Sequence, residues 1–142
     1  MDLYTILKEA HSGWRYIVLL LLAVVIVKYV IGWLQKGQWT NLDRRLGLFT
    51  TIAVDIQLLL GLIIWGMLPM QSYYDQLEEG FRRIQMMEHP ALMLIAVVVM
   101  HVGWIRGRKA PVDANKFRNG ALTFIVTGLL VALGVALITG FI

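Results

Sequence analysis

The chain contains no cysteine and few charged side chains: only 15% of its 142 residues are Asp, Glu, Lys or Arg. Without cysteine it cannot form disulfides, thiolate-held iron–sulfur clusters, covalently attached c-type haem or a Cys-ligated zinc site. Histidine is therefore the main candidate metal ligand, and there are 3 histidines. Hydrophobic residues make up 58% of the chain and the mean hydropathy is +0.70. Such values lie far outside the range of soluble proteins.

Four apolar runs dominate the sequence, at about 12–34, 46–68, 90–105 and 120–142. A helix of about 20 apolar residues spans the roughly 30 Å hydrocarbon core of a bilayer, and the third run reaches that length with its flanks. The first run lacks the basic start and small-residue cleavage site of a secretory peptide, so we expect it to stay as an anchor. We therefore expect residues 1–142 to form a single transmembrane domain in contact with the lipid bilayer.

Short connections between these runs predict an all-α, up-down-up-down four-helix bundle in which the first and third spans lie diagonally across the core. The longer connection carries Leu77, Phe81, Ile84 and Met87 at helical spacing. This pattern predicts a short interfacial helix over residues 72–87, lying on the membrane surface between helices 2 and 3. In the last span, the small residues 132, 136 and 140 recur every four positions, a spacing typical of helix contacts in lipid.

The net charge of +4 does not indicate nucleic-acid binding, because the basic residues lie in loops beside apolar runs. The first and third loops hold eight Lys and Arg, whereas the N-terminal region and the second loop hold four. The positive-inside rule then places loops 1 and 3 in the cytoplasm and both termini outside.

Two histidines stand where two diagonal spans begin, on the same predicted side of the membrane: His11 and His89. Facing imidazoles at matched depth can hold a b-type haem iron without covalent attachment. Gly13 would let a flat macrocycle approach the backbone, and Arg15 would pair with a haem propionate. The alternative is that both histidines are interfacial residues at helix starts. His101 lies about 120° around the helix from His89, since twelve residues separate them, so one such haem is the most that the histidines allow.

A second set of ionisable residues lies deeper in the predicted spans. Lys28 and Asp55 form an ion pair in one interpretation. In the other, Asp55 and His101 form a pair that handles protons or binds quinone, since a carboxylate beside an imidazole tunes the proton affinity of both. Glu88, next to His89, would play the matching role on the outside.

The motifs HSGWRY at 11–16, DIQLLLGL at 55–62, EHP at 88–90 and HVG at 101–103 resemble a family of small bacterial four-helix membrane proteins often labelled cytochrome-b-like. The resemblance covers nearly the whole chain and implies electron transfer in the bacterial inner membrane. Some members carry a histidine where this chain has Asp55. A haem ligand from the second helix is therefore not expected here, and His11 and His89 remain the pair.

Two functions compete at this point. The first is a membrane electron-transfer protein that binds one haem b and exchanges electrons with menaquinone or ubiquinone, at most a subunit of a quinone-linked oxidoreductase. The second is a cofactor-free accessory subunit of a larger respiratory or photosynthetic electron-transport complex. The small size of the chain and the absence of hydrolytic or nucleotide-binding motifs support this alternative.

Overall fold

The computed structural model describes residues 1–140, and these contain helices and loops but no strand. The four long helices are α1 (Leu3–Leu34), α2 (Asn41–Met67), α4 (His89–Arg108) and α5 (Asp113–Thr139). The connection between α2 and α4 contains η1 (Leu68–Met70), η2 (Tyr74–Gln76), α3 (Glu79–Arg83) and the π-helix η3 (Ile84–Glu88). The all-α prediction is therefore confirmed for the described residues.

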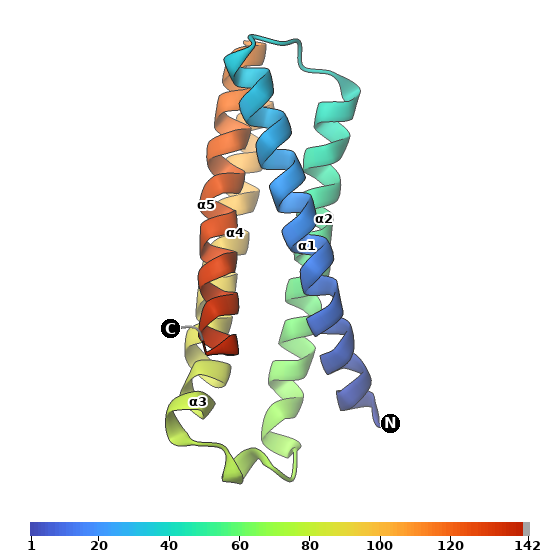
Figure 1. Cartoon of the computed structure of the whole chain (residues 1–142), viewed down its shortest axis with the longest axis vertical. Coiled ribbons are helices and arrows are strands. Elements are labelled where there is room, and N and C mark those ends of the chain that lie inside the picture. The colour runs from blue at the N-terminus through green and yellow to red at the C-terminus, as the bar shows by residue number, and fades with distance from the viewer. Residues whose placement is uncertain (141–142) are drawn as a thin grey trace.

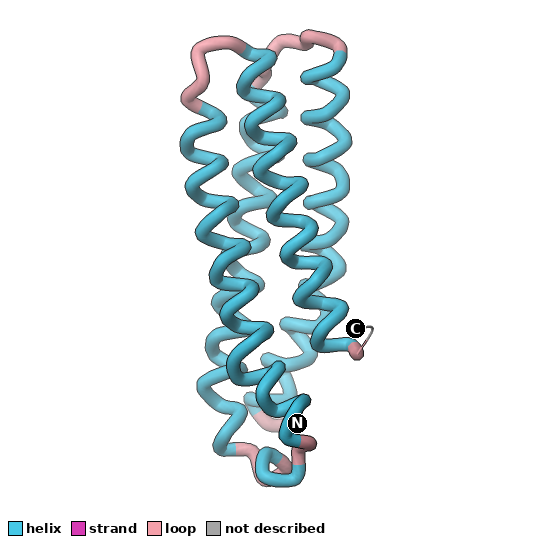
Figure 2. Tube along the Cα trace, turned by 90° about the vertical axis from the view of Figure 1, so that its left-hand side faces the viewer, coloured by secondary structure: helices cyan, strands magenta, loops and turns pink. Residues whose placement is uncertain are grey.

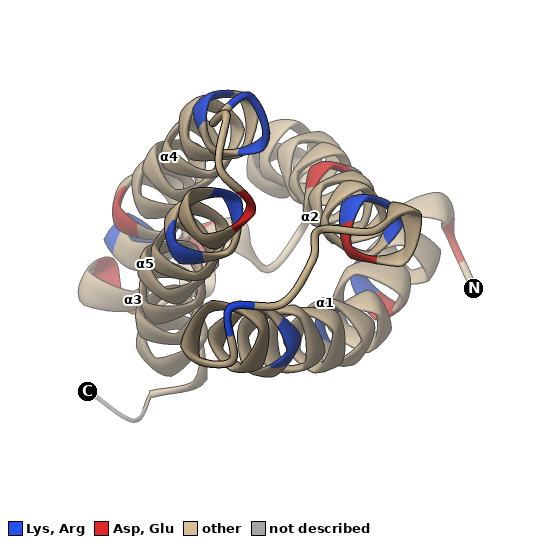
Figure 3. Cartoon of the chain, turned by 90° about the horizontal axis from the view of Figure 1, so that it is seen from above, with Lys and Arg blue, Asp and Glu red and all other residues tan. Residues whose placement is uncertain are grey.

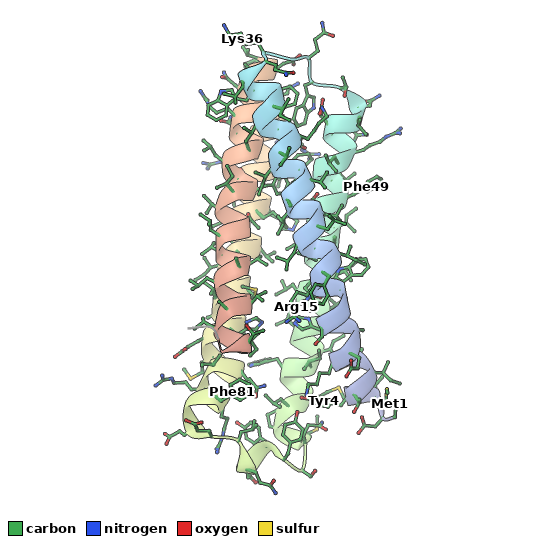
Figure 4. The ribbon with its side chains drawn as sticks, viewed as in Figure 1. Met1, Tyr4, Arg15, Lys36, Phe49 and Phe81 are labelled. Carbon is green, nitrogen blue, oxygen red and sulfur yellow. The ribbon has the colours of Figure 1, made fainter. Side chains whose placement is uncertain are left out.

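The four long helices stand side by side, with the short elements at one end (Figures 1 and 2). α1 packs against α2 and α5, and α4 packs against α5 and α2, so α1 and α4 lie across the bundle from each other. Each long helix contains a stretch apolar enough to cross a membrane, which fits a multi-pass membrane protein. Large apolar side chains cover the outside. Phe49, for example, is 56% exposed and points away from the bundle in Figure 4.

The helices extend past the ends of the predicted apolar runs, and polar capping residues start α1 and α2 earlier. α1 begins at Leu3 rather than near 12, where Asp2 Oδ1 accepts the backbone N–H of Thr5 at 2.9 Å. α2 begins at Asn41 rather than near 46, because Thr40 and Asp43 form a capping box. α5 begins at Asp113 rather than 120 and is described to Thr139, followed by Gly140 in the left-handed conformation that commonly ends helices. Residues 141 and 142 of the predicted span lie outside the described part.

The connection between α2 and α4 differs from the predicted helix over 72–87. Helical structure begins at Glu79 and runs without a break through η3 into α4. Pro90 lacks the N–H that would normally bond to the carbonyl of Met86, and the indole N–H of Trp65 donates to that carbonyl at 2.9 Å instead. The N–H of His89 bonds to Ile84 O, five residues back, which makes the turn before Pro90 a π-turn. The chain therefore passes Pro90 without leaving the helix.

An aromatic cluster fills the core at the end of the bundle that carries the two short loops. It comprises Tyr29, Trp39, Trp104, Phe117 and Phe124, with ring centroids 5.1 to 6.4 Å apart. Glycines at 32, 47 and 120 allow this packing, because a Cβ at any of them would collide with one of these rings. Aromatic rings therefore fill the interior of this half of the bundle. The cavity that could hold a ligand lies in the opposite half.

Candidate functional site

A cavity of about 420 Å³ lies among all four long helices in the half that contains the N-terminus. Its size falls within the range of small-molecule and cofactor pockets. Apolar side chains form most of its wall, with Val18, Val54, Ala96 and Val131 among the deepest-buried of them. Tyr4 and Phe81, labelled in the lower part of Figure 4, contribute from α1 and α3. The cavity thus suits a mainly apolar ligand held by a few polar groups.

His11 enters the cavity from α1, on the same helix face as Lys8 and Arg15, which also line it. The ring of His11 lies over Gly61 of α2, where a Cβ would stand only 3.0 Å from Cε1 of the imidazole. Its Nδ1 is buried and forms no hydrogen bond with any residue in 1–140. An unpaired buried nitrogen costs roughly 1–3 kcal/mol, so the ring gains from a ligand that engages it.

His89 enters the same cavity from the first turn of α4. Its Nδ1 lies 3.0 Å from the backbone carbonyl of Gly134 in α5. Since a carbonyl oxygen only accepts hydrogen bonds, Nδ1 carries the proton and Nε2 keeps its lone pair. A hydrogen bond of this kind orients metal-ligating histidines and fixes their tautomer. His89 is thus prepared to act as a ligand through Nε2.

The two imidazoles come from helices that lie across the bundle, and both line the same cavity. Among residues 1–140, no three His, Cys, Asp or Glu side chains come together to hold a bare metal ion. Two imidazoles are, however, the ligand set for an iron whose other four nitrogens come from a macrocycle. The donor set and the largely apolar wall therefore fit a b-type haem.

Arg15 and Gly13 were both expected beside the haem, and only Arg15 lines the cavity. Its guanidinium stacks on the ring of Tyr16, 5.0 Å from the ring centroid, and donates to that hydroxyl at 3.2 Å. Gly13 is exposed, lies outside the cavity wall, and has nothing within 4 Å of where a Cβ would stand. Two residues turn the helix by about 200°, so the face that carries His11 cannot also carry Gly13. Gly13 therefore does not lie where a macrocycle in this cavity would approach the backbone.

Asp55 and His101 come together on the side of the bundle between α2 and α4. Nε2 of His101 lies 2.7 Å from Oδ1 of Asp55. Neither residue lines the cavity, so the pair forms a second and separate group of ionisable side chains.

The expected pair of Lys28 and Asp55 is wrong, because Lys28 bonds to Asp43 at 2.7 Å. Asp43 is fully buried and also accepts the backbone N–H and the hydroxyl of Thr40, both at 2.9 Å. The carboxylate of Asp55 pairs with the imidazole of His101 instead. The long side chain of Lys28 instead reaches toward the near end of the bundle, as lysines in membrane spans commonly do.

Glu88 does not act beside His89 either. Its carboxylate pairs with the guanidinium of Arg83 at 2.9 Å, and it is absent from the cavity wall. Successive residues point about 100° apart on a helix, so the inward direction of His89 turns Glu88 away.

Three residues of the site were not expected from the sequence: Gly61, Gly134 and Gln57. Gln57 donates to the backbone carbonyl of His11 at 2.8 Å, and its own Oε1 is buried without a partner among the described residues. Gln57 and Gly61 are four residues apart, so a polar and a small residue share one face of α2. That pattern is the one local signal that could have pointed to this wall of the cavity.

No family model, no curated protein and no solved structure matches this chain. The case for its function therefore rests on its residues and their geometry.

Proposed function

We propose that this chain is a membrane electron-transfer protein that holds one b-type haem between His11 and His89 and exchanges electrons with a membrane quinone such as menaquinone or ubiquinone. One observation carries the proposal: two imidazoles from opposite helices line one apolar cavity, and the backbone carbonyl of Gly134 fixes the tautomer of one of them. When bound, the haem supplies a one-electron redox centre. The protein on its own is at most one subunit of a quinone-linked oxidoreductase.

The residues of the chain bind and orient the group in this proposal. The carbonyl of Gly134 holds the Nδ1–H of His89, so Nε2 would be free to bind the iron. Gly61 gives the ring of His11 the space to lie between α1 and α2 at the cavity wall. Arg15 lines the cavity four residues from His11 and would turn from Tyr16 toward a propionate. The surrounding apolar side chains exclude water, which strengthens these charge interactions.

The charge distribution supports an orientation for the four spans. Figure 3, seen from the end with the two short loops, shows Lys and Arg gathered at that end. In an up-down-up-down crossing of the bacterial inner membrane, the positive-inside rule makes this the cytoplasmic end. Both termini and the haem then lie toward the outer face.

The test is an absorption spectrum of the purified protein, reduced with dithionite minus oxidised in air, after expression with ample haem precursor. We expect b-type bands, and a pyridine haemochrome assay should give about one haem per chain, since two histidines line the cavity. A blank spectrum from well-folded protein would overturn the proposal and favour the accessory subunit of an electron-transport complex.

Gly61→Ala should weaken haem binding by displacing the ring of His11. The added Cβ would stand 3.0 Å from Cε1 of His11, so the imidazole must shift away from its position. We expect haem affinity to fall by roughly tenfold, at the low end of the effect of removing groups that orient a metal ligand. Haem titration of the apoprotein measures this. Gly66→Ala is the matched control, because nothing lies within 4 Å of its Cβ. Equal affinities for the two variants would contradict the position assigned to His11.

A further inference from the structure

The pair formed by Asp55 and His101 has an unusual environment for ionisable groups. The two side chains are 42% and 41% exposed, although they lie 2.7 Å from each other. Beyond this one contact, neither side chain forms a hydrogen bond with any residue in the described part of the chain. One carboxylate oxygen and one imidazole nitrogen therefore face the surroundings of the protein rather than its core.

Asp55 lies near the middle of α2, and His101 lies inside α4, nearer its C-terminal end. Asp55 is 14 residues after the start of α2 and 12 before its end, about 21 Å and 18 Å along the axis. His101 is 12 residues after the start of α4 and 7 before its end, about 18 Å and 10.5 Å along the axis. Both residues are thus set back from the helix ends, where lipid head groups and bulk water lie.

The surface around the pair is apolar and bulky. The neighbours one turn away on the exposed faces of the two helices are Ile52 and Leu59 on α2, and Val98 and Ile105 on α4. They are 41% to 62% exposed. Helices that pack in lipid use small residues at such positions. This face is thus better suited to a small ligand from the bilayer than to another helix.

We propose that Asp55 and His101 bind the head group of a membrane quinone or quinol, a site on the lipid-facing side of the bundle that is distinct from the cavity. A quinone is apolar enough to reside in the hydrocarbon core; a ring oxygen of the quinone accepts from an imidazole N–H, and a ring hydroxyl of the quinol donates to a carboxylate. This inference rests on the proposed function, which names a membrane quinone as the redox partner.

The experiment is photolabelling of the purified full-length protein in lipid nanodiscs with a short-tailed azidoquinone, followed by mass spectrometry. In the wild type we expect the label on α2 and α4 near Asp55 and His101. Asp55→Asn and His101→Gln remove a charge or a ring but keep a polar group of similar size. Each should lower labelling at subsaturating quinone by roughly tenfold or more, because a hydrogen bond to a charged group is lost. Glu88→Gln is the control, since it neutralises a carboxylate away from this face.

Labelling that is unchanged in both variants, or that maps to the cavity, would overturn the site. The same holds if Val98→Cys links two copies of the chain by a disulfide in the membrane, because a second copy would then cover the pair. The chain has no other cysteine to confuse this result. His89→Ala separates this inference from the proposed function, because this variant should lose haem but still take the quinone label near Asp55 and His101. Labelling that persists in a wild type without haem would leave the quinone site standing while the haem proposal falls, and a haem protein that takes no label would do the reverse.

Discussion

Replacing His89 or His11 by alanine should abolish the b-type spectrum. Each substitution removes one of two axial ligands, and His89→Ala also leaves the carbonyl of Gly134 without its side-chain donor. Losing only a group that orients a metal ligand typically costs 10–100-fold in affinity. We therefore expect the loss of a ligand itself to lower haem affinity by at least about 100-fold. The haem-to-protein ratio after purification measures this.

His101→Ala is the matched control for these variants, because it removes the remaining histidine. That residue pairs with Asp55 outside the cavity, so its loss should leave the haem content near the wild-type value. Far-UV circular dichroism should show the same helix content in all three variants. Full haem retention in both His11→Ala and His89→Ala would disprove ligation by this pair.

Asp43→Asn should be the most destabilising of the conservative polar substitutions. The carboxylate is buried and accepts hydrogen bonds from Lys28 and from two groups of Thr40, at 2.7 to 2.9 Å. Hydrogen bonds to charged groups contribute about 1.5–3 kcal/mol each, and an amide can replace only some of them. We expect a loss of about 3 kcal/mol in the free energy of unfolding, below the sum because Lys28 is partly exposed. Unfolding in a single detergent, followed by circular dichroism, measures it.

Glu88→Gln provides the comparison for Asp43→Asn. It also breaks an ion pair, but the side chains of Arg83 and Glu88 are 65% and 40% exposed. An exposed pair contributes less than about 1 kcal/mol, so the midpoint of unfolding should hardly move. If Asp43→Asn were no more destabilising than Glu88→Gln, the buried network at the start of α2 would not stabilise the bundle as described.

The sequence by itself determined the class of the molecule. Hydrophobicity acts locally along the chain, so four apolar runs were sufficient to predict four helices long enough to cross a membrane, and the described residues contain them. The same sequence predicted the ends of the helices less well. Capping by Asp2 and Thr40 carries α1 and α2 beyond the apolar runs, because polar residues remain helical once their backbone groups are satisfied.

Only the tertiary structure decided which side chains meet. Lys28 could have paired with Asp55 on sequence grounds, and the packing gave it Asp43 and gave Asp55 to His101. Such choices depend on the rotation of each helix about its own axis. An error of one residue turns a side chain by about 100°, which is why Gly13 and Glu88 point away from the cavity while His11 and His89 line it.

The π-turn before Pro90 shows the same limit most clearly. Within it, the carbonyl of Met86 accepts a hydrogen bond from Trp65, a residue from a different part of the chain. The sequence therefore indicated that His11 and His89 were the candidates for a site. Packing of α2, α4 and α5 around them decided that they share one cavity, because that outcome rests on contacts between segments far apart in sequence.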